Sequence, residues 1–157
     1  MKVFIEISKG SNMKYEHDKD NNCLVLDRVL HNTNFFPYNY GYIPNTLSPD
    51  NDPLDIIILC DYPIIPGSYI NCKIIGGIST SDESGDDDKI IAILDDSSDP
   101  KSQYINDIVD INKIDLDNII YFLIHYKDNE KNKFINVGNF YNKNEAENII
   151  SKYTLND

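Results

Sequence analysis

The sequence Asp50-Asn51-Asp52-Pro53-Leu54-Asp55 stands directly before the apolar run Ile56-Ile57-Ile58-Leu59-Cys60. Pro53 fixes its own φ, has no N–H for a strand ladder, and biases Asp52 before it toward an extended conformation. We therefore expect a turn that leads into a buried strand. Asp50 and Asp52 are expected in the turn and Asp55 on the strand, so that three carboxylates lie at the mouth of the strand.

Three carboxylates at this spacing point to a bound cation. Unpaired acids so close together repel one another and raise each other's pKa unless a cation neutralises them. Carboxylate oxygens are hard ligands, which favour Mg²⁺, Mn²⁺ or Ca²⁺. The alternative is a solvated acidic turn, the more common structure for a loop rich in Asp and Asn. The apolar strand that follows argues against this alternative, because a buried strand would hold the acids in place.

A second acidic cluster, Asp82-Glu83-Ser84-Gly85-Asp86-Asp87-Asp88-Lys89, precedes another apolar strand from Ile90 to Leu94. It repeats the arrangement of carboxylates at the mouth of a strand. An acidic solvated loop is again the alternative. Two such clusters in one small domain would together supply enough oxygen atoms for several divalent ions.

An aromatic segment from Phe35 to Pro44 contains five aromatic residues, two prolines and a glycine. It is too irregular for a helix and too aromatic for a solvated loop, so we expect it to pack along a cavity. Phe35, Tyr38 and Tyr42 are best interpreted as core residues. Tyr40, next to a glycine, is the candidate for a functional role.

The other elements follow from hydrophobic periodicity and turn signals. A strand is expected over 3–7, a hairpin over 14–18 and 23–28, a long strand over 67–78 with a bulge at Gly76-Gly77, and a short strand over 134–137. A helix is expected from about 116 to about 127, with Asp115 or Asp117 at its start, and a last helix that begins at Asn142 and Glu145.

Composition and charge restrict the class of protein. The 157 residues are the length of one ordinary domain, and we expect a single domain over 1–157. The formal net charge of −12 argues against nucleic acid or an anionic membrane as a partner, and an anionic substrate would need metal ions as a bridge. No apolar run is long enough for a signal peptide core or a membrane span. Three cysteines without a C-x-x-C pair are interpreted as reduced core thiols, so a cytoplasmic protein is expected.

The motifs, taken in order, resemble those of the soluble family I inorganic pyrophosphatases of the short prokaryotic type. They are Lys14-Tyr15-Glu16, Asp27-Arg28, Asn39-Tyr40-Gly41-Tyr42, the D-x-D-P-x-D signature from Asp50 to Asp55, Asp82-Glu83-x-Gly85-x-Asp87-x-Lys89, and His125-Tyr126-Lys127-Asp128. The resemblance runs from about Val3 to the final helix. It implies a mainly β fold with α elements: an OB-like five-stranded β-barrel flanked by two C-terminal helices.

The resemblance also implies an inorganic diphosphatase. Its reaction would be the Mg²⁺-dependent hydrolysis of pyrophosphate to two orthophosphates by a metal-activated hydroxide. Three to four Mg²⁺ would bind per active site, with Mn²⁺ as an alternative, and the short relatives are typically homohexamers. His125, on the predicted helix, would then be an interface residue, although an ordinary helix histidine is an equal alternative.

The family's site residues carry over by position. Asp50, Asp55 and Asp87 would hold the first metal, and Asp55 would bridge to the second. Asp82 and Asp87 would hold a third ion and Glu16 a fourth, while Asp52 would orient the attacking water. Glu6 would act mostly through water, and Glu83 would tune its loop. The residues expected to contact phosphate are Lys14, Arg28, Tyr40, Lys89, Tyr126 and Lys127, with the leaving phosphate stabilised mainly by Arg28, Tyr126 and Lys127.

The rival hypothesis is a catalytically impaired, divalent-cation-binding OB-like barrel. A pure cation site has no use for the basic residues Lys14, Arg28, Lys89 and Lys127 in one set, which argues against it. Two features depart from the family pattern. Phe36 stands where tyrosine is common, so that a hydroxyl near the phosphate site is missing. The chain also begins almost directly at the first barrel strand, without the N-terminal extension that contributes to assembly in many relatives.

Overall fold

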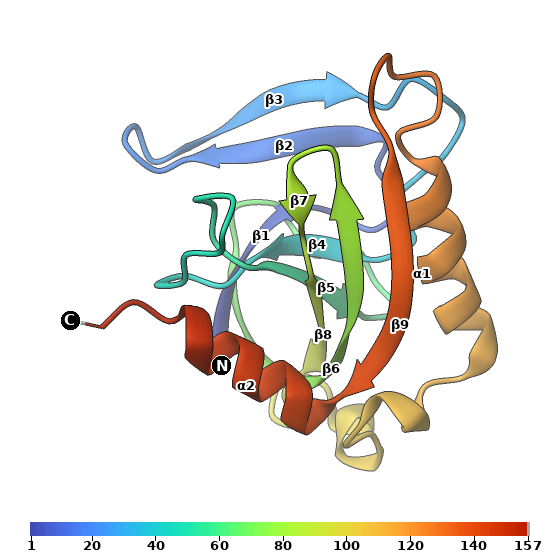
Figure 1. Cartoon of the computed structure of the whole chain (residues 1–157). Coiled ribbons are helices and arrows are strands. Elements are labelled where there is room, and N and C mark those ends of the chain that lie inside the picture. The colour runs from blue at the N-terminus through green and yellow to red at the C-terminus, as the bar shows by residue number, and fades with distance from the viewer. Residues whose placement is uncertain (157) are drawn as a thin grey trace.

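The computed structural model describes residues 1–156, and its centre is a closed ring of five strands (Figure 1). In ring order these are β1 (Lys2–Ile7), β4 (Asn39–Tyr42), β5 (Asp55–Leu59), β8 (Lys89–Leu94) and β6 (Tyr69–Asp82). The pairs are antiparallel except for β5 with β8, which is parallel, and β6 closes the ring by pairing with β1. The predicted five-stranded barrel is therefore confirmed.

The remaining elements surround this ring. They are the hairpin of β2 (Met13–Asp18) and β3 (Cys23–Val29), the short β7 (Gly85–Asp86), the 3-10 turns η1 (Pro100–Tyr104) and η2 (Ile108–Asp110), and α1 (Lys113–His125), β9 (Ile135–Asn142) and α2 (Lys143–Tyr153). Figure 1 shows the hairpin at one end of the ring, α1 beside β9, and α2 at the other end. The two predicted C-terminal helices are thus present.

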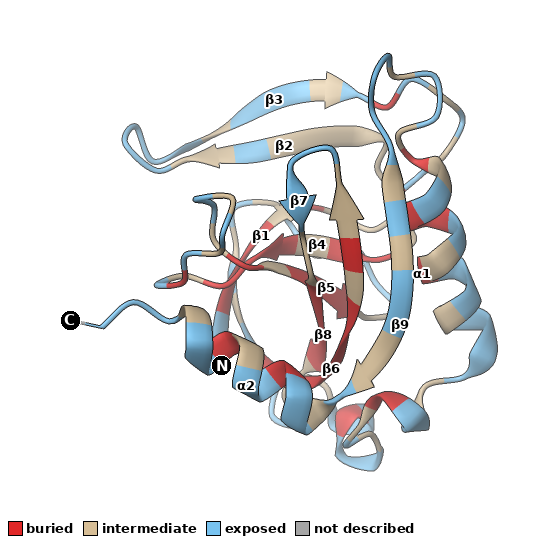
Figure 2. Ribbon diagram, in the orientation of Figure 1, coloured by how far each residue is buried: buried red, intermediate tan, exposed pale blue. Residues whose placement is uncertain are grey.

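The strands of the ring are buried on both faces, which explains the unbroken apolar runs of β5 and β8 (Figure 2). Successive side chains of a strand point to opposite faces. Ile56 and Ile58 accordingly pack in one core cluster with Ala146 and Ile150 of α2. Ile57 packs in a second cluster that receives side chains from α1. The two helices therefore pack against opposite faces of β5. This packing fixes the position of the strand and of the acids at its start.

The aromatic segment differs from the prediction, because part of it is the strand β4. A Cβ at Gly41 would lie 1.8 Å from the carbonyl oxygen of Phe4, so only glycine allows β4 to pair so closely with β1. Tyr38 and Tyr42 are buried as expected. Phe35 is 55% exposed, so its interpretation as a core residue was wrong, and its neighbour Phe36 fills the core instead.

Three further expectations need correction. Helix α1 starts at Lys113 and not at Asp115 or Asp117, because Asn112 caps it by accepting a hydrogen bond from the backbone N–H of Asp115. The strand predicted over 134–137 continues to Asn142, and it pairs with β6 along its length. Cys23 is exposed and only Cys72 is buried, so the three cysteines are not all core thiols. Asn142 does cap the last helix as predicted.

The long strand β6 bends as the two adjacent glycines predicted. Its register against β8 shifts between Ile74 and Gly76, where the strand bulges. Beyond the bulge it pairs with β9 and forms a tight hairpin with β7. Asp82 ends β6, so this bend carries the second acidic cluster to the mouth of β5. Among residues 1–156, the structure contains no helix with the length and apolar character needed to cross a membrane.

Candidate active site

A cleft of about 660 Å³ opens where the β2–β3 hairpin, the acidic turn before β5, the β6–β7 hairpin and the loop after α1 meet. Every site residue predicted from the sequence lines it. These are Glu6, Lys14, Glu16, Arg28, Tyr40, Asp50, Asp52, Asp55, Asp82, Glu83, Asp87, Lys89, Tyr126 and Lys127. The fold therefore gathers acidic, basic and phenolic side chains from distant parts of the chain into one place.

Lys89 is the centre of the charges in the cleft. It opens β8 opposite Asp55, which opens the parallel strand β5. Its Nζ donates to Oδ2 of Asp87 at 2.6 Å and also to Oδ2 of Asp55, and its side chain is only 3% exposed. Burial alone would lower the pKa of Lys89, but Asp55 and Asp87 outweigh burial and raise it. The ammonium group therefore stays charged and holds the two carboxylates together.

The acidic turn before β5 is stabilised by hydrogen bonds to the carboxylate of Asp50, its first acid. Asn51 adopts a left-handed φ of 69°, which asparagine tolerates better than most residues. Oδ1 of Asp50 accepts from the backbone N–H of Asp52 at 3.0 Å and from the Ser48 hydroxyl at 2.5 Å. Burial raises the pKa of Asp52, and the neighbouring Asp50 and Asp55 raise it further. The turn thus holds acids that repel one another, as its sequence predicted.

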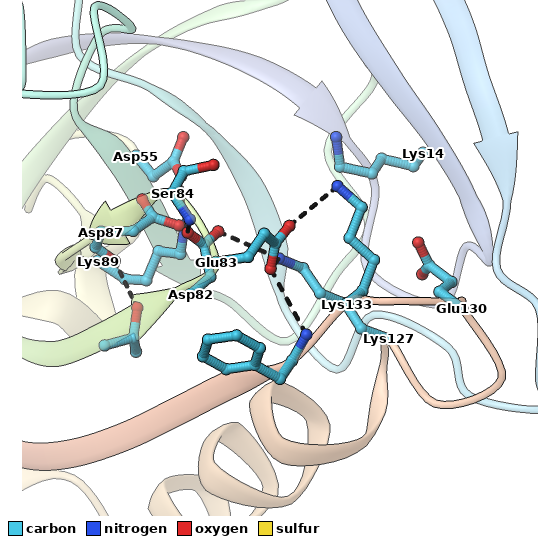
Figure 3. A network of polar contacts seen from close by, with 12 residues as sticks. Lys14, Asp55, Asp82, Glu83, Ser84, Asp87, Lys89, Lys127, Glu130 and Lys133 are labelled. Carbon is cyan, nitrogen blue, oxygen red and sulfur yellow. Dashed lines mark hydrogen bonds and ion pairs between the residues drawn. The ribbon is translucent and has the colours of Figure 1, made fainter.

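The β6–β7 hairpin presents its two acids to lysines from the C-terminal part of the chain (Figure 3). Lys127 Nζ lies 3.2 Å from Oδ2 of Asp82, whose Oδ1 accepts from the backbone N–H of Ser84 at 2.8 Å. Glu83 pairs with Lys133 at 2.9 Å. Sequence reasoning missed Lys133, because a lysine in a polar loop carries no signal of its partner.

The β2–β3 hairpin brings a second group of charges to the cleft. Lys14 lies opposite Arg28 in the pairing of the two strands. Lys14 Nζ lies 2.7 Å from Glu16 Oε1 and 3.5 Å from Asp27 Oδ2. Arg28 pairs with Asp27 through Nη1 and with Glu130 through Nε. Glu130, beyond the end of α1, does not line the cleft but holds Arg28, a role that the sequence did not reveal.

Two phenols complete the cleft. Burial raises the pKa of Tyr126, and burial followed by Asp55 and Asp87 raises that of Tyr40. Both hydroxyls therefore stay protonated and can donate hydrogen bonds to an anion. Phe36 is buried behind them, with its ring centroid 5.9 Å from that of Tyr40 and 6.5 Å from that of Tyr126. Phe36 thus does not line the cleft itself but packs against the two tyrosines that do.

The acids of the cleft are poised to accept positive charge. Burial, opposed in part by the Lys89 ammonium and reinforced by Asp55, raises the pKa of Asp87 to about 6. Burial also raises the pKa of Glu6 to about 7, although its carboxylate accepts from the backbone N–H of His17 at 2.7 Å. Among residues 1–156, no three His, Cys, Asp or Glu side chains lie close enough to hold a metal ion as they stand. Lysine ammonium groups lie between the carboxylates instead.

The raised pKa of Glu6 makes the stability of the fold depend on pH. Unfolded Glu6 loses its proton near pH 4.5, whereas the folded carboxyl group keeps it to about pH 7, so stability falls as the pH rises through this interval. Glu6→Gln removes this loss. In metal-free buffer we expect the variant to be more stable than the wild type at pH 8 by about 1–3 kcal/mol. At pH 4 we expect this difference to shrink. Urea unfolding at both pH values measures it, and a difference independent of pH would contradict the expectation.

The comparisons with known proteins agree with this geometry. A family model described as inorganic pyrophosphatase matches residues 3–156. The inorganic pyrophosphatase of Helicobacter pylori is 45% identical over 150 residues, which are 96% of this chain and 87% of the relative. That of Saccharolobus solfataricus is 41% identical over 150 residues, again 96% of this chain and 87% of the relative.

Solved structures give the same result. The inorganic pyrophosphatase structure from Helicobacter pylori superposes with a TM-score of 0.96 at 44% identity, covering 98% of this chain and 91% of the other. The structure from Thermus thermophilus superposes with a TM-score of 0.93 at 33% identity, covering 98% and 88%. The family resemblance inferred from the motifs is therefore confirmed. The chain belongs to the inorganic pyrophosphatase family, whose enzymes are inorganic diphosphatases.

Proposed function

We propose that the cleft hydrolyses pyrophosphate to two orthophosphates with the help of Mg²⁺. The observation that carries this proposal is the composition of the cleft, whose lining combines carboxylates with two phenols and the basic residues Lys14, Arg28, Lys89 and Lys127. Phosphoryl transfer requires mainly that charge be neutralised and that the reacting groups be positioned. A cleft with both kinds of charge meets these two requirements.

The carboxylates fit divalent metal ions. Their oxygens are the hard ligands that Mg²⁺ prefers, with Mn²⁺ as an alternative. The environment that raises the pKa of Asp52 and Asp87 disfavours their negative charge, and a divalent cation relieves this cost as a proton would. When bound, Mg²⁺ lowers the pKa of a coordinated water from 15.7 toward about 7 and neutralises the charge of both phosphates.

We assign the carboxylates to three or four such ions. Asp50, Asp55 and Asp87 would hold the first ion and Asp55 would also reach the second. Asp82 and Asp87 would serve a third, and Glu16 a fourth that arrives with the substrate. Glu6 and Glu83 would act without binding a metal ion directly. Glu6 accepts a hydrogen bond from the backbone N–H of His17, and Glu83 forms an ion pair with Lys133.

The basic and phenolic residues would hold the phosphates. Lys14, Lys89 and Tyr40 would orient the phosphate that is attacked. Arg28, Tyr126 and Lys127 would neutralise the charge that develops on the leaving phosphate. The four basic residues assigned to phosphate, Lys14, Arg28, Lys89 and Lys127, each already pair with a carboxylate, so substrate binding would exchange one anionic partner for another.

Asp52 would have a different role from its neighbours. Burial and the neighbouring Asp50 and Asp55 raise the pKa of Asp52, which makes its carboxylate a better proton acceptor, and we assign it to orient the attacking water. Oδ1 of Asp50 accepts a hydrogen bond within the turn, and the position of Asp55 is set by strand β5. Three acids within six residues would therefore perform two functions.

The direct test is the release of phosphate from pyrophosphate by the wild-type chain in excess Mg²⁺. We expect turnover that excess EDTA abolishes, because the carboxylates alone cannot activate water. Full activity in EDTA would contradict the metal mechanism. Stoichiometric Mg²⁺ binding without turnover would favour the rival hypothesis of an impaired cation-binding barrel, which leaves Lys14, Arg28, Lys89 and Lys127 without a role.

The separate roles of Asp52 and Asp55 can be tested with asparagine, which keeps the shape of the side chain and removes its charge. Asp55→Asn should weaken metal binding, so that added Mg²⁺ recovers part of the lost activity. Asp52→Asn should lower kcat by about 10²–10⁴-fold at saturating Mg²⁺ and shift the pH–rate profile. A Mg²⁺ titration of both variants at several pH values measures this. Recovery of wild-type kcat by Asp52→Asn at high Mg²⁺ would make Asp52 a metal ligand.

We also propose a homohexamer, which the outer face of α1 supports. Ile114 and Tyr121 on this helix are 72% and 60% exposed. The His125 ring packs against that of Tyr121, with centroids 4.4 Å apart, and its Nδ1 lies 2.8 Å from Oδ2 of Asp128. Burial of such apolar side chains is the usual basis of association. Light scattering should give six times the chain mass of 18.0 kDa, and a monomer at micromolar concentration would refute the hexamer.

The domain organisation, location and partners of the protein are proposed on the same basis. We propose that residues 1–157 act as one domain, because β6 pairs with strands from both halves of the chain. We propose the cytoplasm as its location, since all three cysteines are free thiols, two of them at least partly exposed, as a reducing compartment allows. Nucleic acid and anionic membranes are not proposed as partners, because the net charge of −12 repels them.

A further inference from the structure

Two segments far apart in the sequence carry the cations assigned to the leaving phosphate. Arg28 lies on β3, and Tyr126 and Lys127 follow the last residue of α1. No hydrogen-bonded pair of strands joins β3 to this loop in the part of the chain that the structure describes. Their relative position must therefore be set by side chains.

Asn32 joins the two segments. Its Nδ2 lies 3.3, 3.2 and 3.0 Å from the carbonyl oxygens of His125, Tyr126 and Asp128. His125 is the last residue of α1, and Tyr126 and Asp128 follow it, so this one amide ties the chain after β3 to the end of the helix. Asn32 Oδ1 in turn accepts from the backbone N–H and the side-chain amide of Asn34, at 3.0 and 2.7 Å. These contacts fix which way the Asn32 amide faces.

Three other contacts run between the same segments. Asn34 Nδ2 donates to the His125 carbonyl at 3.3 Å, and Asn129 Nδ2 donates to the His31 carbonyl at 3.0 Å. The third joins Glu130 to Arg28 itself, with Nε 3.1 Å from Oε1 and Nη2 3.3 Å from Oε2. Glu130 lies on the loop beyond Lys127, and its side chain is 6% exposed (Figure 3). Nη2 donates a hydrogen bond to this carboxylate, whereas Nε lies within ion-pair distance of it without forming a hydrogen bond.

This ion pair determines what Arg28 can offer to a substrate. One hydrogen bond, from Nη2, ties the guanidinium group to Glu130, and Nη1 points to the hairpin carboxylate of Asp27. The Asp27 side chain is 34% exposed, whereas that of Glu130 is 6% exposed. An anion in the cleft can therefore displace the partly exposed Asp27 from Nη1, while the buried Glu130 keeps its ion pair with the other side of the guanidinium group.

We propose that Asn32 and Glu130 are positioning residues that set the place of Arg28 relative to Tyr126 and Lys127, and so build the subsite for the leaving phosphate. The proposal rests on the function proposed above, because it assigns these three cations to one phosphate. Neither residue lines the cleft, and neither touches the carboxylates assigned to metal ions. Their loss should therefore weaken phosphate contacts and leave the metal requirement unchanged.

The test compares Asn32→Ala and Glu130→Gln with Asn112→Ala. Asn112 caps the opposite end of the same helix, so its loss destabilises α1 without touching the cleft. We expect Asn32→Ala and Glu130→Gln to lower kcat by about 10- to 100-fold, the order of effect that small misplacements of catalytic groups produce. The Mg²⁺ concentration for half-maximal activity should stay as in the wild type. Asn112→Ala should lower the melting temperature and keep wild-type kcat.

A second measurement does not depend on turnover. Titration calorimetry with inorganic phosphate in excess Mg²⁺ should show binding about tenfold weaker for both variants and unchanged for Asn112→Ala. Asn32→Asp keeps the size of the side chain but turns a carboxylate toward the helix carbonyls. It should be impaired at least as much as Asn32→Ala, and it replaces that variant if Asn32→Ala fails to fold.

The outcomes separate this inference from the proposed function. An active wild type whose Asn32 and Glu130 variants keep wild-type kcat and phosphate affinity would overturn the inference alone. A parallel loss of Mg²⁺ affinity would also overturn it, because the variants would then distort the whole cleft. A wild type that releases no phosphate from pyrophosphate would overturn the proposed function.

Discussion

The ion pairs of Lys89 with Asp55 and Asp87 are the interaction on which the active site depends. Asp55 and Lys89 are the first residues of two parallel strands and lie opposite each other, so the register of the barrel itself sets their approach. The Lys89 side chain is almost fully buried, and a buried charge is costly unless it is paired. The fold and the arrangement of site charges therefore depend on each other, since a shift of the register would separate these groups.

Other basic residues of the cleft are also held by ion pairs with carboxylates. Lys127 pairs with Asp82, Lys133 with Glu83, and Arg28 with Glu130. A chain of net charge −12 can thus present a cluster of cations to an anionic substrate, because each cation is held by a carboxylate with a fixed position. Divalent ions and pyrophosphate would complete this arrangement by exchanging partners with charges that are already in place.

Much of the site was predictable because its signals are local. The turn from Asp50 to Asp55 could be recognised from Pro53 and the apolar run that follows, and the hairpin with Lys14 and Arg28 from alternation around a polar turn. Strand β4 was not recognised, because its pairing depends on the close approach of Gly41 to Phe4, a contact between residues distant in the sequence. The start of α1 was misplaced for a smaller reason: Asn112 and Asp115 are both common capping residues, and only the geometry distinguishes them.

The residues that hold the cations in position could not be predicted at all. Asn32 and Glu130 lie in polar loops where asparagine and glutamate are common, and their partners are 93 to 102 positions away in the chain. No periodicity or motif connects such pairs. Long-range contacts between side chains become visible only once the barrel and α1 bring their segments together.

The most direct test of the charge balance at Lys89 is the stability of Lys89→Met with and without Mg²⁺. Methionine keeps the length of the side chain and leaves Asp55 and Asp87 unpaired, so in EDTA we predict a loss of about 3–5 kcal/mol. Excess Mg²⁺ should restore a large part of it, because the ions neutralise the same carboxylates. Lys73→Met removes a lysine that pairs with the exposed Asp96, outside the cleft, and its stability should be the same in both buffers. An equal loss for Lys89→Met in EDTA and in Mg²⁺ would contradict the account.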